Sequence, residues 1–437
     1  MMPDFMTLPE APTFALLRAT VPAVCLADAS SFEAKEGLIS VDIVVAEGKI
    51  DAILPAGTAP AALPAADLRD GMAWPTFTDM HTHIDKGHIW ERRRNPDGTF
   101  MGALENVMAD RQANWSADDV AARMEFSLKS AYAHGTGLLR THLDSLPPQH
   151  EISFEVFSHM REKWADRLEL QAVALFSIDM IFEPFFDDLT KLLKRHNGLI
   201  GGVTQMLPDL DARLDRMFRA AADNGLDIDL HVDETEDREV LTLGRIAEAT
   251  LRNGFEGSVT VGHCCSLARQ DAETAKRTID LVARAGLSVV SLPMCNMYLQ
   301  DRHEGRTPRW RGVTLFKELA AAGVKTAVSS DNTRDPFYAY GDLDPVEVIR
   351  EAVRILQLDH PLDETARIIT KTPAEILGRA ERGVIAEGGP ADLVLFSARR
   401  WSEFLSRPQA DRIVMRNGMG IDRSLPDYRE LDPLMDK

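Results

Sequence analysis

The chain has 437 residues, of which 45% are hydrophobic and 27% are charged, as in an ordinary soluble protein. Its 68 acidic residues outnumber its 49 basic ones, and the net charge of −19 argues against nucleic acid or an anionic membrane as a partner. No apolar run approaches the ~20 residues of a membrane span. The N-terminal residues lack a secretory signal pattern and the four cysteines lack disulfide spacing, so we expect a cytoplasmic protein with reduced thiols.

Both ends of the chain predict short β-strands. Near the N-terminal end, apolar residues alternate at Val41, Ile43 and Val45, and a turn at Gly48 separates this run from the next one. Similar short apolar runs return towards the C-terminal end at residues 383–385, 391–396 and 412–415. We therefore expect a small β-sandwich domain that is built from both chain ends, residues 1–71 and 377–437.

The middle of the chain, residues 72–376, alternates apolar runs with longer amphipathic segments. The clearest helical segment opens at Ser116, with Asp119 three residues on, and stops at Gly135. Eight strand-helix units over ~250–300 residues are typical of a TIM-like (β/α)8 barrel in the α/β class. An open doubly wound sheet competes, but no Gly-rich phosphate turn follows the first strand. The predicted strands are residues 77–83, 138–144, 168–176, 199–206, 228–234, 259–264, 287–293 and 324–331.

The first of these strands ends in two histidines, His81 and His83. Positions i and i+2 of a strand point to the same side, so both imidazoles would face one point in space. Imidazole is a common ligand of transition metals. Such a pair also occurs in exposed loops, so the interpretation depends on the other strand ends.

Polar residues close several other predicted strands, on the face where a barrel of this kind carries its active site. With His81 and His83, the imidazole of His231 and the carboxylate of Asp331 predict one divalent ion per subunit, Zn²⁺ or Fe²⁺, with a water in the open position. His142 is either a further ligand or a hydrogen-bonding brace of its strand. The strand-end residues are His142, Asp144, His231, Asp233, Glu234, His263 and Asp331.

Glu234 lies three residues beyond His231, where a carboxylate can move protons between a metal-bound water and a substrate. The alternative is that Glu234 belongs to a solvated acidic run, residues 233–237. His263 could hydrogen-bond the attacking water without binding the metal. Residues 171–177 contain no Lys, Asp or Glu that could bridge a second ion, so we expect a mononuclear site. Lys86 either points to solvent or reaches the substrate.

These stretches resemble the motif series of the amidohydrolase superfamily, and specifically its cytosine deaminase-like branch. The resemblance implies that His81, His83, His231 and Asp331 hold one metal ion. It implies that Glu234 protonates a ring nitrogen, that His263 orients the hydroxide on the metal, and that Asp331 passes a proton to the departing ammonia. The likeness spans nearly the whole chain and rests on residues 81–83, 140–144, 231–234, 262–264, 293–302, 330–336 and 389–394.

Four residues depart from the cytosine deaminase pattern and mark candidate substrate-binding positions. Ser177 stands where those enzymes present a Gln, Asn332 stands where they carry a second Asp, and Phe337 replaces a Trp. Lys86 is similar to the HxHxDK form of relatives that hydrolyse amino-substituted triazines. The shorter side chain at position 177 predicts a pocket that accepts a larger or differently substituted ring.

We therefore expect a hydrolase of cyclic amidine C–N bonds that removes an exocyclic amine from an aromatic N-heterocycle and releases ammonia. Cytosine-like pyrimidines come first as substrates, followed by pterins and aminotriazines. One alternative is hydrolysis of a cyclic amide or imide, which usually uses two metals and a carboxylated lysine. The other is a catalytically silent barrel protein, which should have lost a ligand. The expected partner is a small molecule, and a homo-oligomer stays compatible with the sequence.

Overall fold

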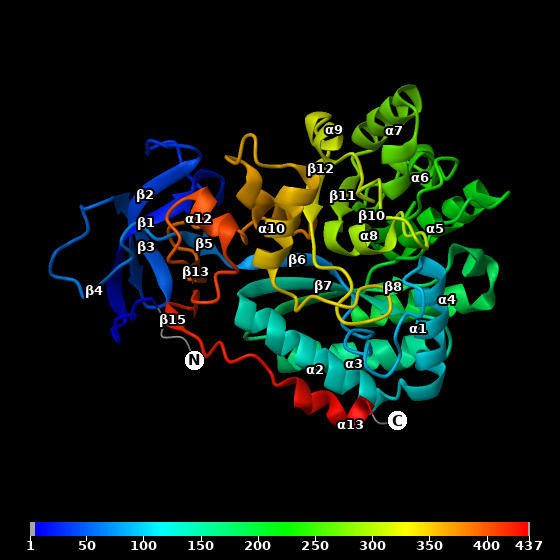
Figure 1. Cartoon of the computed structure of the whole chain (residues 1–437), viewed down its shortest axis with the longest axis horizontal. Helices are drawn as coiled ribbons and strands as arrows, with labels where there is room; N and C mark the ends of the chain where they lie inside the picture. The colour runs from blue at the N-terminus through cyan, green and yellow to red at the C-terminus, as the bar shows by residue number, and fades with distance from the viewer. Residues whose placement is uncertain (1–4, 436–437) are drawn as a thin grey trace. The chain divides into compact units, whose positions relative to one another are not determined.

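The computed structural model describes residues 5–435, which form two compact units (Figure 1). Unit 1 contains residues 5–78, 129–138 and 344–425, and unit 2 contains residues 79–128, 139–343 and 426–435. The fold mixes helices and sheets, as the α/β prediction required. None of the helices among the described residues has the length and apolar character needed to cross a bilayer.

Unit 1 contains two four-stranded sheets to which both ends of the chain contribute. The first has the order β3-β2-β1-β4, from β3 (Lys49–Pro55), β2 (Leu38–Ala46), β1 (Thr13–Pro22) and β4 (Ala65–Asp67). The second has the order β15-β14-β13-β5, from β15 (Met419–Gly420), β14 (Ile413–Arg416), β13 (Leu393–Leu395) and β5 (Ala73–Pro75). The ring of Trp74 on β5 is fully buried and stacks on Phe404 at 4.8 Å between centroids, which anchors the core of this unit.

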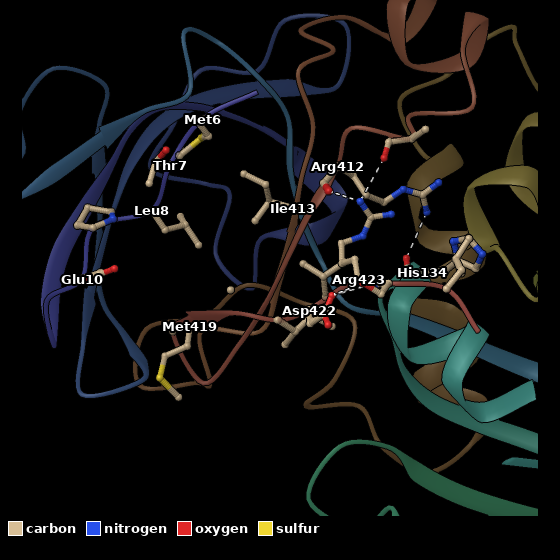
Figure 2. A pocket seen from close by; sticks show the side chains of 18 of the residues that line it. Met6, Thr7, Leu8, Glu10, His134, Arg412, Ile413, Met419, Asp422 and Arg423 are labelled. Atoms are coloured by element: carbon tan, nitrogen blue, oxygen red, sulfur yellow. Dashed lines mark hydrogen bonds between the residues drawn. The ribbon is translucent and has the colours of Figure 1, made fainter. Parts of the chain in front are cut away.

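Unit 1 also contains a pocket of about 1330 Å³ between the segment around Leu8 and the segment around Met419 (Figure 2). Its two arginines are held by the protein itself. Arg412 donates to both carboxylate oxygens of Asp344 at 2.6 and 2.7 Å, and Arg423 donates to the backbone oxygen of Ala133 at 2.9 Å. The two guanidinium groups of this pocket are therefore already engaged in structural contacts.

Two further sheets carry the strands that lead into unit 2. One has the order β6-β7-β8, from β6 (Phe77–Thr82), β7 (Thr136–Asp144) and β8 (Glu169–Leu175). The other is parallel and has the order β12-β11-β10-β9, from β9 (Ile228–Val232), β10 (Val259–His263), β11 (Ser288–Ser291) and β12 (Lys325–Val328). Every residue of β6, β7, β9 and β10 is buried, as expected for strands covered on both faces.

Isolated parallel bridges extend these two sheets. Residues 199–203 bridge to β8 on one side and to β9 on the other, and Thr82 bridges to Asp331. The expected strand at residues 199–206 is thus present only as bridges. The reason lies in two glycines: a Cβ at Gly201 would stand 2.2 Å from the backbone oxygen of Ala174, and Gly202 has a φ of +138°, so a regular ladder is interrupted there.

Helices connect most of the consecutive strands. The helix expected from Ser116 to Gly135 is α2 (Ala117–His134), and Ser116 Oγ accepts a hydrogen bond from the backbone N–H of Asp119 at 3.3 Å. The other α-helices are α1 (Phe100–Asn114), α3 (Gln149–Lys163), α4 (Pro184–His196), α5 (Leu210–Asn224), α6 (Thr242–Arg252), α7 (Ala272–Arg284), α8 (Pro293–Leu299), α9 (Phe316–Ala321), α10 (Pro345–Leu356), α11 (Lys371–Ile376), α12 (Trp401–Ser406) and α13 (Asp432–Met435). Short 3₁₀ turns are η1 (Ala23–Cys25), η2 (Ile178–Phe182), η3 (Cys265–Arg269), η4 (Thr365–Ile369) and η5 (Tyr428–Leu431).

Candidate metal centre

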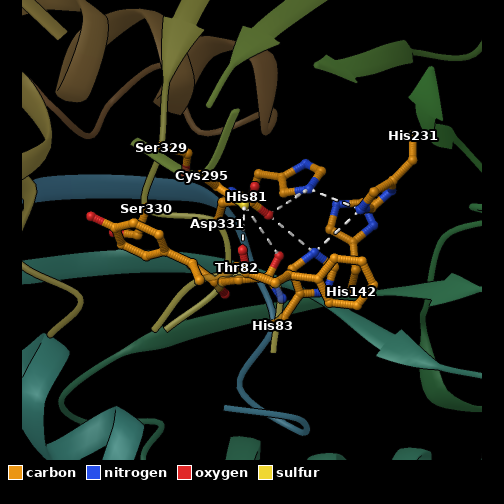
Figure 3. A network of polar contacts seen from close by, with 12 residues as sticks. His81, Thr82, His83, His142, His231, Cys295, Ser329, Ser330 and Asp331 are labelled. Carbon is orange, nitrogen blue, oxygen red and sulfur yellow. Dashed lines mark hydrogen bonds and ion pairs between the residues drawn. The ribbon is translucent and has the colours of Figure 1, made fainter. Parts of the chain in front are cut away.

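Four side chains meet where β6, β9 and β12 end (Figure 3). His81 is the second-to-last residue of β6, and His83 follows the end of the strand. Their rings therefore lie on one side of the chain, as the two-residue period predicts. His231 lies near the end of β9, and Asp331 follows β12. The backbone N–H of Asp331 donates a hydrogen bond to the His81 carbonyl at 2.9 Å, which joins this residue to β6.

The distances between the four side chains leave room for one ion. The Nε2 atom of His231 lies 3.2 Å from the Nε2 atoms of both His81 and His83. Asp331 Oδ1 lies 3.3 Å from His83 Nε2 and 3.7 Å from His81 Nε2. A tetrahedral ion bound at about 2.0–2.1 Å separates its ligand atoms by about 3.3–3.4 Å, which is close to this spacing.

The protonation of these imidazoles also fits a cation. Burial lowers the pKa of His81, His83 and His231 well below the usual value, so the rings are neutral, which is the form that binds metals. One proton on His231 Nε2 could serve only one of its two nitrogen neighbours. A lone pair on His231 Nε2 could likewise accept only one well-directed hydrogen bond, whereas a shared cation can bind the lone pairs of all three nitrogens.

Asp331 completes this arrangement as a buried carboxylate. Neither of its oxygens has an N–H or O–H donor among the described residues. Burial raises its pKa to about 7. The thiol of Cys295 is a weak hydrogen-bond donor to it. Burying a carboxylate without N–H or O–H donors is costly unless a positive charge compensates it, so Asp331 fits the same cation as the three histidines.

A second carboxylate holds the two strand ends together. Asp79 on β6 accepts hydrogen bonds from the backbone N–H of Ser330 at 3.0 Å and from Ser330 Oγ at 2.5 Å, and it also contacts Ser329 Oγ. Ser329 Oγ in turn accepts from the His81 backbone N–H at 2.8 Å. Asp79 therefore fixes His81 and Asp331 relative to each other, a role that we did not predict from the sequence.

His142 lies beside the four side chains. Its ring centroid is 4.0 Å from that of His81, and its Nε2 is 3.8 Å from Asp229 Oδ1. The other oxygen of Asp229 accepts from Arg140 Nη1 at 2.8 Å. His81, His142 and Asp229 also satisfy the spacing of a metal site, but the guanidinium already compensates the charge of this carboxylate.

Glu234 and His263 face each other at the ends of β9 and β10. Glu234 Oε1 lies 3.4 Å from His263 Nδ1. Burial, followed by the nearby Asp331, raises the pKa of Glu234 well above its usual value. Burial, followed by the charge of Lys86, lowers the pKa of His263 to about 3. A neutral Glu234 can donate a proton, and a neutral His263 carries its proton on one nitrogen only.

Asn296 on α8 decides which nitrogen of His263 is protonated. Its Nδ2 lies 2.9 Å from His263 Nδ1 and 3.3 Å from Glu234 Oε1. An amide that donates to both makes Nδ1 an acceptor, so the proton of His263 is on Nε2. His263 lies in one group with His81 and His231, which are two of the candidate metal ligands. We did not assign this role to Asn296 from the sequence.

The backbone is strained at these strand ends. Four residues other than glycine have a positive φ there, namely Asp233 (51°), His263 (68°), Cys264 (51°) and Asp331 (65°). Such conformations cost about 1–3 kcal/mol each and tend to gather at functional sites. Three of these four, Asp233, His263 and Asp331, are residues that the strand-end pattern identified.

Of the four candidate substrate-binding residues, Lys86 and Phe337 contact each other, whereas Asn332 and Ser177 have other partners. Lys86 Nζ lies 5.0 Å from the ring centroid of Phe337, so these two are close. Asn332 Nδ2 donates to Asp335 Oδ2 at 2.8 Å, which turns its amide towards that carboxylate. Ser177 Oγ accepts from Gln205 Nε2 at 3.0 Å and follows a different strand, β8. Burial opposes the charged form of Lys86, but Asp144 and other carboxylates raise its pKa overall.

Comparison with known proteins identifies the family of this chain. The model of the Amidohydrolase family matches residues 139–418. This chain belongs to the amidohydrolase family. A pterin deaminase from Rhizobium rhizogenes is 71% identical to this amidohydrolase over 433 residues, which is 99% of each chain. The N-isopropylammelide isopropyl amidohydrolase of a Pseudomonas species is 26% identical and covers 80% of this chain and 86% of its own.

Solved structures share the fold of this amidohydrolase. The 5-methylcytosine deaminase of Klebsiella pneumoniae with bound phosphonocytosine has a TM-score of 0.78 at 22% identity, over 93% of this chain and 98% of its own. The N-isopropylammelide isopropylaminohydrolase of Burkholderia multivorans has a TM-score of 0.72 at 22% identity, over 94% and 98%. The superfamily that we inferred from the motifs is therefore confirmed.

Proposed function

We propose that this amidohydrolase is a metal-dependent pterin deaminase. The hydrolytic deamination of N-heterocycles that the sequence predicted is confirmed at that level by its relatives. The choice of a pterin rests on one observation, the 71% identity to a pterin deaminase over 99% of both chains. A pterin has two fused rings, so this substrate also agrees with the wider pocket expected from Ser177.

We also propose the domain arrangement expected from the sequence. Residues 72–376 would form a (β/α)8 barrel, and residues 1–71 and 377–437 a composite β-sandwich. The parallel bridges of residues 199–203 and of Thr82 with Asp331 support closure of the barrel, because each connects strands that the regular sheets leave apart. The two four-stranded sheets of unit 1 support the sandwich.

His81, His83, His231 and Asp331 would hold one divalent ion, Zn²⁺ or Fe²⁺. When bound, such an ion lowers the pKa of a water molecule and so supplies a nucleophile near neutral pH. The neutral imidazoles and the carboxylate without donors support this assignment. The segment from Gln171 to Ser177 offers no carboxylate or lysine for a second ion, so we propose a mononuclear site.

Glu234 and His263 would handle the water and the ring. The Nε2–H of His263 would donate to the attacking water and orient it towards the carbon that bears the amine. Glu234 would pass its proton to the ring nitrogen next to that carbon and would regain a proton from the attacking water, which leaves one proton on the attacking oxygen. Its raised pKa supports this role because a neutral carboxyl has a proton to give. The product of this step is a tetrahedral carbon that carries both the new oxygen and the amine.

Asp331 would complete the proton balance. It would accept the remaining proton of the attacking oxygen and pass it to the amine, so the C–N bond breaks as the C=O bond forms. One water is consumed, and one ammonia and one ring carbonyl result. Among the residues expected to contact the ring, Lys86 and Phe337 lie together, whereas Asn332 and Ser177 would contact it from other sides.

The rival functions are less well supported. Cyclic amide hydrolysis would usually require two ions that a lysine bridges. Residues 171–177 contain no lysine and no carboxylate that could bridge a second ion. A silent paralogue should lack a ligand, yet all four candidate ligand atoms lie within 4 Å of a neighbour in the set. We also infer a cytoplasmic location, which the four unpaired cysteines support, and a small heterocyclic molecule as the partner of the site.

Ammonia release from a panel of pterins, aminopyrimidines and aminotriazines tests this function. We expect wild-type protein to deaminate pterins fastest, and Glu234→Gln to lose a factor of about 10² or more in kcat while it keeps its metal. Glu183→Gln, at an exposed position before α4, is a control of the same residue type that should keep full activity. Equal rates for Glu234→Gln and wild type would remove Glu234 from the mechanism, and no release from any pterin would reject the substrate.

A further inference from the structure

Lys86 is a buried lysine whose ammonium has one hydrogen-bond partner among the described residues and also lies over the ring of Phe337. Its side chain is 5% exposed, and its Nζ lies 3.4 Å from Asp144 Oδ1. An ammonium has three N–H donors, and no second acceptor of Nζ is found among the described residues. A buried donor without an acceptor is costly. Lys86 therefore has donors to offer to a molecule that enters the site.

The position of this ammonium depends on Asp144, whose two oxygens have different partners. Oδ1 faces Lys86, and Oδ2 accepts from Arg111 Nη1 at 2.9 Å. The backbone N–H of Asp144 donates to Asp85 Oδ2 at 2.8 Å. The side chains of Arg111 and Asp144 are only 11% and 9% exposed. A carboxylate held at both oxygens and through its backbone cannot turn away from the lysine.

Arg111 is in turn fixed by the helix that carries it. The preceding residue of α1, Asp110, accepts from Arg92 Nη2 at 2.9 Å and from Trp115 Nε1 at 2.8 Å. Arg92 also donates to Asp119 on α2. These contacts are buried, so they hold α1 in place and bring the guanidinium of Arg111 to Asp144.

We propose that Asp144 and Arg111 are positioning residues that hold the Lys86 ammonium against the substrate. Arg111 fixes the carboxylate of Asp144, Asp144 fixes Lys86, and the two remaining N–H donors of Lys86 bind an acceptor oxygen or nitrogen of the heterocycle. This inference rests on the proposed deaminase function. It adds α1, a helix that carries none of the candidate metal ligands, to the residues that determine how the ring binds.

The simplest alternative is a structural ion pair. Arg111 and Asp144 would then stabilise the fold without acting through Lys86. The two cases differ in how mutations combine, because residues that act through one another are not additive whereas independent sites are. A double-mutant cycle therefore separates them.

The experiment measures kcat, KM and bound metal for wild type, Lys86→Ala, Arg111→Ala and the double variant, with pterin as the substrate. Lys86→Ala should lower kcat/KM about tenfold or more, mainly through KM, because it removes a charged hydrogen-bond donor. Arg111→Ala should cause a smaller loss of roughly threefold to tenfold. The double variant should match Lys86→Ala alone, and metal content should stay at the wild-type level in all four proteins.

Losses that multiply in the double variant would overturn the proposal, because Arg111 would then act independently of Lys86. Asp144→Asn is the second variant, since it keeps the shape of the side chain and should lose activity to the same extent as Arg111→Ala or more. Arg245→Ala is the matched control, because Arg245 Nε also donates to an aspartate, Asp211, at 2.9 Å but joins α6 to α5. Its kcat/KM should equal that of wild type.

A crystal structure of Arg111→Ala gives a readout that does not need activity. We expect the contact between Lys86 Nζ and Asp144 to be lost or displaced while the metal ligands keep their places. If Lys86 Nζ keeps its contact with Asp144 in the structure of Arg111→Ala, the positioning role of Arg111 is wrong, whatever the activity of the variant. If wild type releases no ammonia from pterins but the contact is displaced as expected, the substrate proposal fails and the positioning of Lys86 stands.

Discussion

The ring of His81 packs directly against Gly262. A Cβ added to Gly262 would stand 2.9 Å from His81 Cε1 and 3.2 Å from His81 Nδ1. Gly262 lies in β10, one residue before His263. Because position 262 has no side chain, the imidazole of His81 has space there, and any larger residue would displace this ring.

Gly262→Ala should therefore weaken metal binding. Because the ring must shift by a few tenths of an ångström or more, we expect the metal Kd to rise about tenfold or more, as for changes in the support of a ligand. Competition with a chelator, followed by measurement of retained metal, checks this. Gly244→Ala is the control, since its Cβ would meet only Thr278 Oγ1 at 3.8 Å. Unchanged affinity in Gly262→Ala would show that His81 does not bind the ion in this position.

His231→Ala and His142→Ala should differ in bound metal. His231 has the Nε2 atom that lies 3.2 Å from two other imidazoles, so its loss should leave the purified protein with little metal. His142 lies against Asp229, which Arg140 already neutralises, so its variant should keep about one equivalent. Elemental analysis by plasma mass spectrometry measures both. Loss of metal from His142→Ala would place His142 among the ligands instead.

Asn296→Asp should invert the tautomer of His263. The new carboxylate would accept a proton from Nδ1, so Nε2 would lose its N–H and could no longer donate to water. We expect kcat to fall by about 10²-fold, as when one donor to the reacting oxygen is removed, with metal content unchanged. Nitrogen-15 NMR of the histidine ring reports the tautomer independently. A variant with full activity would show that the proton on His263 Nε2 is not needed.

Ser177→Gln should favour smaller rings. Ser177 Oγ is bound by Gln205 at the rim, and a longer amide at position 177 would fill space that a second ring needs. We expect the ratio of kcat/KM for cytosine to that for pterin to rise by about tenfold or more. Ser177→Ala serves as the control, because it removes the contact with Gln205 without adding volume. An unchanged ratio would show that this position does not contact the ring.

Asp344→Asn should make the stability of unit 1 less dependent on pH. Burial alone would raise the pKa of Asp344, but Arg412 first and His134 second hold it below its usual range. The ionised carboxylate therefore stabilises the fold fully above the unfolded pKa of about 3.9, and this stabilisation is lost as the pH falls towards the folded value. At pH 7 the variant should be less stable by about 3 kcal/mol, because Arg412 stays buried without its partner.

Thermal unfolding at pH 7 and below pH 4 measures this effect. The difference between wild type and Asp344→Asn should be largest at pH 7 and should shrink below pH 4, where the carboxyl of Asp344 takes up a proton in the unfolded chain while it stays ionised in the folded protein. Asp411→Asn is the control, because Asp411 accepts from Ser397 Oγ at an exposed site and has no cationic partner in that contact. A difference that stays constant with pH would contradict the role of the charge.

The parts of this site that follow from strand geometry could be predicted from the sequence. The two-residue period placed His81 and His83 on one side, and the rule that parallel strands end at one edge placed His231 and Asp331 near them. The sequence did not predict Asn296, because its contact with Glu234 joins residues that are 62 positions apart and depends on how α8 packs. Asp79 was also missed, since a carboxylate within an apolar strand gives no sign of the serines that it will meet.

The fold shows the same division. The helix at Ser116–Gly135 was predictable because its cap and its glycine lie next to it in the sequence. The sequence predicted a regular strand at residues 199–206, and the structure has only isolated bridges there. The adjacent glycines Gly201 and Gly202 interrupt the strand. Gly201 is required by the close approach of the Ala174 backbone on β8, and Gly202 by its φ of +138°; no local pattern reveals either.

The bridge between Thr82 and Asp331 has a consequence for how the enzyme is made. The histidines at positions 81 and 83 leave the ribosome early, whereas the carboxylate follows after roughly 10–50 s of synthesis at ~5–20 residues per second. During that interval the nascent chain has imidazoles without the aspartate that joins them. We therefore expect the proposed ion to bind the complete ligand set only after residue 331 has been synthesised and Asp331 has joined β6.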